Sequence, residues 1–240
     1  MNVPRRIGIL GGMGPQATIL LQQKLLDAVT ADDDCDHIPL IVDMNPQVPS
    51  RIEHLIHKRG DSPAPVLVVM AKRLQAAGAE ALAMPCNTAH CYSDAILDAV
   101  SLPFLDMVAL AVENADRILG QGGRVGILAS PAVQMTELFD KALAQRGLTT
   151  VWPKNSAEML QAIQLVKSEG PCAQAKKIFC AASHELAVKG ALLQLVACSE
   201  FSLLIDNVVP GVRAVDTLDL LVTAIRDFSL KFTGAPETVS

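Results

Sequence analysis

The chain contains few aromatic residues, few charged residues and no long apolar run. Aromatic residues make up 3% and charged residues 19% of its 240 residues, whereas hydrophobic residues make up 50%. An interior with so few rings must be built mainly from alanine, leucine, valine and isoleucine, which is typical of an α/β protein. The length suits one large domain or two small ones.

The sequence also lacks a cluster of basic residues, and its formal net charge is −5 at pH 7. A nucleic-acid surface needs a basic stripe, so we expect no nucleic-acid partner. No apolar run approaches the length of a membrane span, and the first apolar segment is too short for the core of a signal peptide. These absences predict a soluble, cytoplasmic protein with no membrane partner.

The cysteines form neither a CxxC pair nor a His/Cys cluster with zinc spacing, so we expect no metal site. In a large chain in a reducing compartment they are expected to be free thiols. Six are present, at positions 35, 86, 91, 172, 180 and 198. A free cysteine is usually a packing residue, and we interpret Cys35, Cys91, Cys172 and Cys180 in that way.

Short apolar runs alternate with longer segments of helical periodicity, which predicts parallel sheets covered by helices. The predicted strands are 6–11, 40–44, 81–84, 103–105, 123–129 and 192–197. The predicted helices are 17–30, 65–77, 88–100, 134–146, 156–168, 171–189 and a last one from an N-cap at Asp216 to about Leu230.

The two halves of the chain resemble each other. Segment 7–11 (IGILG) resembles 125–129 (VGILA), and 84–88 (MPCNT) resembles 196–200 (VACSE). The repeat predicts two similar α/β lobes. Cys86 and Cys198 follow equivalent strands, and ligands of open α/β sheets bind outside the carboxyl ends of strands. Two facing lobes would therefore bring both thiols to one cleft.

Two opposed thiols suit the inversion of an α-carbon. A proton must leave one face and another must arrive at the opposite face, so two acid/base groups are needed. The usual thiol pKa of about 8.5 can be lowered by a helix N-terminus or a cation, which gives a thiolate base and a thiol acid. The polar residues that follow each cysteine are expected to hold a carboxylate. They are Asn87, Thr88, Ser199 and Glu200.

Four segments, read in order, resemble the motifs of the aspartate/glutamate racemase family, in its aspartate racemase branch. They are 11–18 (GGMGPQAT), 45–51 (NPQVPSR), 85–90 (PCNTAH) and 197–204 (ACSEFSLL). The resemblance spans nearly the whole chain. It implies two pseudo-symmetric lobes, with residues 1–102 and 210–240 in the first and 103–209 in the second. The C-terminal helix returns to the first lobe, and a homodimer is implied.

The resemblance also implies a mechanism without pyridoxal phosphate or any other cofactor, in which Cys86 and Cys198 shuttle the proton of an acidic amino acid, aspartate or glutamate. By the same resemblance Arg51 and Lys167 face the side-chain carboxylate. The expected α-carboxylate site is Asn87, Thr88 and Ser199. The same cleft is expected to be lined by Met13, Gln47, Ser130 and Glu200.

This chain departs from the family pattern at two places. Ser130-Pro-Ala-Val133 stands where Thr-x-Gly-Thr is usual, and Ser199 stands where a threonine follows the second cysteine. The loss of one hydroxyl beside Ser130 affects the expected substrate preference more than the expected reaction.

Other interpretations stay open at this point. One is a sister reaction on the same scaffold, such as hydantoin racemisation or maleate isomerisation with covalent attack by one cysteine. Another is a non-catalytic protein that binds an acidic metabolite. His90 could approach Cys86 on one helix face, but we interpret it as a packing residue. The glycines of segment 11–14 lack the pattern of a nucleotide-binding loop.

Overall fold

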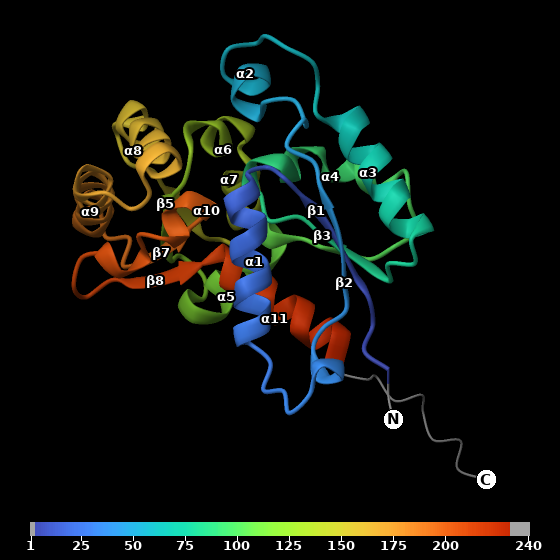
Figure 1. The fold of residues 1–240 in the computed structure, drawn as a ribbon. Helices are drawn as coiled ribbons and strands as arrows, with labels where there is room; N and C mark the ends of the chain where they lie inside the picture. Colours follow the sequence, from blue (N-terminus) through green and yellow to red (C-terminus); the bar gives the residue numbers. More distant parts are fainter. Residues whose placement is uncertain (1–2, 231–240) are drawn as a thin grey trace.

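The computed structural model describes residues 3–230, which form two α/β lobes that lie side by side (Figure 1). The sheet of the first lobe has four parallel strands in the order β2-β1-β3-β4. They are β1 (Ile7–Gly11), β2 (Leu40–Met44), β3 (Ala81–Ala83) and β4 (Phe104–Leu105). Register pairs Ile7 with Leu40 and with Ala81.

The sheet of the second lobe repeats this topology in the order β6-β5-β7-β8, again with parallel strands. Its strands are β5 (Arg124–Leu128), β6 (Thr149–Val151), β7 (Leu193–Val196) and β8 (Arg213–Asp216). The predicted fold, two pseudo-symmetric lobes that each carry a parallel sheet flanked by helices, is therefore confirmed.

The outer faces of the two sheets are covered by helices of their own lobes. On the first sheet, Leu10 and Leu82 pack against Leu67 of α3 (Ala64–Ala76). On the second, Leu128 and Val196 pack against α8 (Ser156–Glu169) and α9 (Ala173–Val188). Alternate residues of each strand face the other way, as the pleat requires.

Two helices lie between the sheets and join the lobes (Figure 1). Helix α5 (Met107–Leu119) places Met107 in the core of the first lobe but Val112 in the core of the second. Helix α11 (Thr217–Leu230) buries Leu221 and Ile225 against the first sheet. Both helices carry apolar residues at intervals of three and four, which gives each an apolar face.

The remaining helices are short or lie at the edges of the lobes. They are α1 (Pro15–Asp27), η1 (Asp34–Asp36), α2 (Arg51–Leu55), η2 (Asn87–Tyr92), α4 (Ser93–Leu97), α6 (Pro131–Thr136), α7 (Leu138–Ala144), α10 (Ser199–Ser202) and η3 (Ile205–Asn207). Within residues 3–230, no helix has the length and apolarity needed to cross a membrane.

The lobe boundaries differ from those expected. Strand β4 lies beyond the expected boundary at residue 102 but pairs with β3 in the first sheet. Strand β8 lies beyond residue 209 but pairs with β7 in the second sheet. In both cases the chain completes its fourth strand before it crosses into α5 or α11. Residues 231–240 of the expected first lobe lie outside the described residues.

Two expected helices are broken. The expected helix 88–100 consists of the 3-10 helix η2 followed by α4. The expected helix 134–146 is divided between α6 and α7 at Glu137, whose φ of 55° lies in the left-handed region. Helix α5 was not expected, although Asp106 before its apolar run is a recognisable N-cap and accepts from the backbone N–H groups of Val108 and Ala109.

Candidate active site

The first cysteine loop follows β3. Cys86 is the N-cap residue of η2 and is partly buried. Its carbonyl oxygen lies 2.9 Å from Nδ1 of His90, and the backbone N–H of Met107 donates to Nε2 of the same ring over 3.1 Å. Because Nε2 accepts, the proton of the neutral ring is on Nδ1. His90 thus ties the Cys86 loop to the start of α5 and has no ring nitrogen left for chemistry.

The second cysteine loop follows β7 at the equivalent place. Cys198 is the N-cap residue of α10, and its thiol donates to Oε2 of Glu200 over 3.0 Å. The hydroxyl of Ser199 donates to the same oxygen over 3.3 Å. The other carboxylate oxygen of Glu200 lies 3.4 Å from Nζ of Lys167. Lys167, which was expected to face a substrate carboxylate, is therefore paired with Glu200.

Burial and the negative charge of Glu200 raise the pKa of Cys198 well above its ordinary value. The lowered pKa that a helix N-terminus or a cation would give is therefore not found at this cysteine. Lys167 acts in the opposite direction but is the weakest contributor. At neutral pH, Cys198 is a protonated thiol that can serve as an acid.

Both cysteines line one cleft of about 90 Å³. One water needs about 10 to 15 Å³ of such space, so the cleft holds a molecule with the size of a small amino acid. A larger drug-sized ligand needs roughly 300 Å³ or more. The cleft takes its walls from both lobes. They consist of Met13, Ser50, Arg51, Ile52, Cys86, Asn87, Thr88, Ser130, Ile163, Lys167, Ala197, Cys198, Ser199 and Glu200.

The structure brings every expected site residue to this cleft except Gln47. Gln47 is exposed, and its backbone N–H donates to Oδ1 of Asn45 over 3.0 Å in a local turn. The same turn passes close to Gly12, where a Cβ atom would lie 2.4 Å from the carbonyl carbon of Asn45. Only glycine fits there, at φ +92°, and it allows the adjacent Met13 to reach the cleft.

Four lining residues were missed by the sequence interpretation: Ser50, Ile52, Ile163 and Ala197. A signal for Ser50 was present, because the segment S-R-I-E at 50–53 has the pattern of a capping box. Its hydroxyl accepts from the backbone N–H of Glu53 over 3.3 Å. The apolar Ile52, Ile163 and Ala197 carry no comparable pattern.

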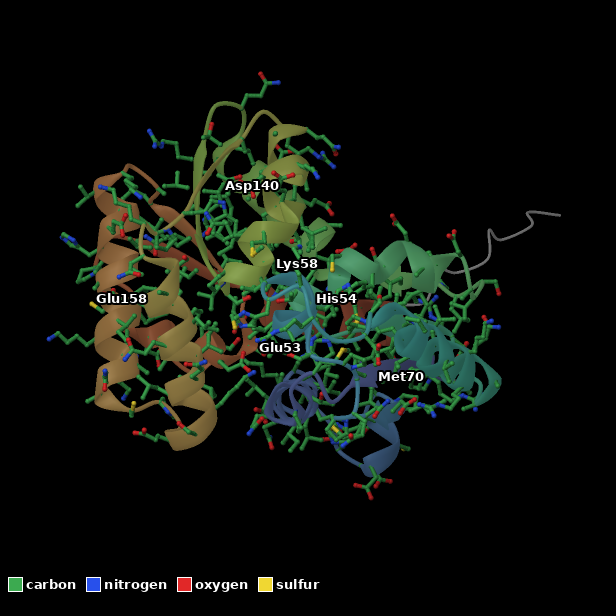
Figure 2. All side chains as sticks on the ribbon, turned by 90° about the horizontal axis from the view of Figure 1, so that it is seen from above. Glu53, His54, Lys58, Met70, Asp140 and Glu158 are labelled. Carbon is green, nitrogen blue, oxygen red and sulfur yellow. The ribbon has the colours of Figure 1, made fainter. Side chains whose placement is uncertain are left out.

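Helix α2 covers the junction of the lobes. Figure 2 shows the residues Glu53, His54 and Lys58 of this region above the junction, between the two lobes. The helix packs against α6 of the second lobe. Arg51 is its first residue, and its guanidinium donates to the carbonyl of Pro49 over 3.2 Å. Arg51 is also one of the residues that line the cleft.

Two polar contacts cross between the lobes at the cleft. The hydroxyls of Thr88 and Ser130 lie 3.4 Å apart. The side-chain amide of Asn87 donates to the hydroxyl of Thr217 over 2.9 Å, and that hydroxyl donates to the carbonyl of Val196 over 3.1 Å. Oδ1 of Asn87 is buried and has no hydrogen-bond partner.

Each lobe has a parallel sheet, and the two lobes present equivalent cysteines to one small cleft. This arrangement is that of a two-lobed α/β isomerase. The pattern of the Asp/Glu/hydantoin racemase family matches residues 10–225. The chain belongs to this family, as the sequence motifs predicted, and is an enzyme of the amino-acid racemase kind.

Individual relatives agree with this assignment. A broad-specificity amino-acid racemase of Bacillus subtilis is 23% identical over 219 residues, which cover 88% of this chain and 92% of the relative. The solved Picrophilus torridus aspartate racemase has a TM-score of 0.83 at 25% identity and covers 93% of each chain. An aspartate racemase homologue from Pyrococcus horikoshii shares the fold, with a TM-score of 0.72 at 21% identity, over 93% of this chain and 98% of its own.

Proposed function

We propose that this protein interconverts the L and D forms of an acidic amino acid, aspartate or glutamate, by two-cysteine proton transfer at the α-carbon. The observation that carries the proposal is that Cys86 and Cys198, at equivalent strand ends of facing lobes, line the same small cleft. Inversion needs one acid/base group on each face of the carbon, and each lobe supplies one.

The protonation of Cys198 gives the two thiols different starting roles. Its raised pKa makes it the acid, and its hydrogen bond to Glu200 holds the proton until the thiol turns to the substrate. Cys86 in its thiolate form takes the α-proton from one face, and Cys198 gives its own proton to the opposite face. The substrate is inverted, Cys86 ends protonated, and Cys198 ends as the thiolate. The reverse reaction restores both.

The polar groups around the thiols suit the charges of an acidic amino acid. Asn87 gives one amide N–H to Thr217, and its second amide N–H is the donor that we assign to the α-carboxylate. The hydroxyl of Thr88 can donate to the α-carboxylate, and that of Ser199 can do so when it leaves Glu200. Arg51 and Lys167 are the cations for the side-chain carboxylate. Lys167 leaves its ion pair with Glu200 and forms one with the substrate carboxylate.

The proposal extends to the cofactor, the compartment and the assembly. The two thiols carry out both proton transfers and the charged side chains bind the substrate, so the proposed reaction needs no pyridoxal phosphate. All six cysteines are free, which is typical of a cytoplasmic protein. The homodimer rests on family resemblance, and light scattering of the purified protein tests it.

Single cysteine variants in deuterated water test the mechanism and the substrate together. Cys86→Ser and Cys198→Ser are each incubated with both enantiomers of aspartate and glutamate. Racemisation, followed by chiral chromatography, is expected to fall about 10²- to 10⁴-fold in each variant. The remaining thiol still removes and returns the hydrogen on its own face. Deuterium, followed by proton NMR, is therefore expected in one enantiomer for Cys86→Ser and in the other for Cys198→Ser.

Cys91→Ser is the matched control, because Cys91 lies on η2 close to Cys86 but does not line the cleft. It is expected to racemise at the wild-type rate. Near wild-type racemisation by either Cys86→Ser or Cys198→Ser would mean that one base suffices, and the two-cysteine proposal would be wrong.

A further inference from the structure

A second, larger groove shares a wall with the active-site cleft. It has a volume of about 360 Å³, compared with about 90 Å³ for the cleft. Lys167, Ser199 and Glu200 line both spaces. The groove lies where α1, α8 and α10 come together, and Figure 1 shows α1 in front of α10 with α8 beside it. The groove therefore adjoins the site at which the α-carbon reacts, with Lys167, Ser199 and Glu200 between the two spaces.

The lining of the groove is mainly apolar. Its apolar side chains are Ala17, Ile19, Leu20, Val166 and Leu203. Ile19 is 59% exposed and Leu203 is 45% exposed, although both are large apolar residues. An acidic side chain would find one cation in the groove, Lys167, which is already paired with Glu200. An apolar side chain would gain free energy there by leaving water.

We propose that this groove receives the side chain of a second class of substrate, amino acids with apolar side chains longer than that of aspartate, while their α-carbon lies between Cys86 and Cys198. This inference rests on the proposed racemase function. The cleft by itself is too small for such a substrate. The adjoining groove supplies the missing space and has the matching polarity.

The charges of the shared wall permit both substrate classes. An apolar substrate offers no carboxylate to Lys167, but Lys167 then keeps Glu200 as its partner and no charge is left unpaired. The side chain of Lys167 is 45% exposed, and an ion pair of this kind costs little to rearrange. Lys167 can therefore move aside for an apolar side chain or turn into the cleft for an acidic one.

A bulky residue in the groove tests this inference. Ile19→Trp fills the groove from α1, and Leu203→Trp fills it from the opposite wall. Leu26→Trp is the matched control, because Leu26 is 51% exposed on the same helix α1 but does not line the groove. The values of kcat/KM for racemisation of phenylalanine, whose side chain is apolar and longer than that of aspartate, and of aspartate are measured by chiral chromatography for the wild type and the three variants.

We expect the wild type to racemise both amino acids. Each methylene group in an apolar pocket is worth about 10-fold or more, so both groove variants are expected to lose at least about 10-fold for phenylalanine. They are expected to stay within about 2-fold of the wild type for aspartate, and Leu26→Trp to resemble the wild type for both. Racemisation of an acidic amino acid without phenylalanine, or unchanged phenylalanine kinetics in both groove variants, would overturn the groove assignment and leave the proposed function standing. Failure to racemise phenylalanine, aspartate and glutamate alike would instead overturn the proposed function, and this inference with it.

Discussion

The carboxylate of Glu200 holds the proton of Cys198, because Oε2 accepts the thiol hydrogen bond and its negative charge opposes a thiolate. Glu200→Gln removes that charge while keeping the shape of the side chain. The pKa of Cys198 is raised in the wild type, so the variant is expected to lower it, and Cys198 should react with iodoacetamide at lower pH. Mass spectrometry of the peptide that contains Cys198 measures the modified fraction against pH.

Cys35 and Cys180 are exposed and serve as internal controls in the same digest. Their alkylation profiles are expected to be identical in the wild type and in Glu200→Gln. If the profile of Cys198 does not move, or moves to higher pH, Glu200 does not control its protonation. In that case the acid role that we assign to Cys198 loses its structural basis.

Among the elements, those with a strong local pattern were predicted within a few residues. Strand β2 and helix α8 are examples, because one is a short apolar run and the other has clear helical periodicity. The 3-10 helix η2 was not predicted. The ring of His90 in η2 is held between the carbonyl of Cys86 and the backbone N–H of Met107. The contact with Met107 spans 17 residues and leaves no periodic signal in the sequence.

The side chain of His90 connects η2 to the start of α5, and its titration makes the stability of the protein depend on pH. Burial lowers the pKa of His90, which acts against the weaker effect of the Asp106 carboxylate 3.9 Å away. The unfolded residue titrates near pH 6.5, so below that pH the unfolded chain binds more protons than the folded one. The contribution of neutral His90 is thus present above about pH 6.5 and is lost as the pH falls, by up to about 1.4 kcal/mol per pH unit.

His90→Gln tests this link, because the amide can still bond both backbone groups but does not titrate. Urea unfolding is measured at pH 7.5 and 5.5. The variant is expected to be less stable at pH 7.5, and the gap from the wild type should narrow by about 1 kcal/mol at pH 5.5. The comparison with the wild type is needed because Asp216 also titrates in this range. Burial raises its pKa to about 6, so its contribution to the stability of the protein falls as the pH rises, which is opposite to the contribution of His90.

His184→Gln is the control for the histidine substitution itself, since His184 is exposed on α9. It is expected to follow the pH dependence of the wild type. A constant gap between the wild type and His90→Gln at the two pH values would show that His90 does not titrate on unfolding in the manner described.

At the scale of the whole molecule, the internal repeat predicted two lobes because equivalent strands must bury equivalent apolar segments. The points at which the chain crosses between lobes were not predicted. Strand β4 is very short, and β8 begins with the exposed Arg213, so neither has the pattern of a buried strand. The residues of the two cysteine loops could be predicted because they follow strand ends, whereas Arg51 and Lys167 were expected only from the family resemblance. Ile52 and Ile163 could not be predicted, since an apolar residue at a cleft resembles one in the core.

Thr217 couples the two lobes at the place where catalysis is proposed. Its hydroxyl accepts from Asn87, next to Cys86, and donates to the carbonyl of Val196, just before the Cys198 loop.

Thr217→Val keeps the shape of the side chain but breaks both bonds, which leaves the Asn87 amide without its partner and lets the two cysteine loops shift relative to each other. A shift of about 1 Å can cost about 10²-fold in rate, so we expect kcat to fall about 10- to 100-fold with a smaller change in KM. Thr217→Ser retains the hydroxyl and is expected to restore kcat. Thr223→Val is the matched control on the same helix, because the exposed Thr223 bonds only the carbonyl of Asp219. Steady-state kinetics are measured alongside urea unfolding. If Thr217→Val loses stability but keeps the wild-type kcat, Thr217 only supports the fold and does not position the cysteines.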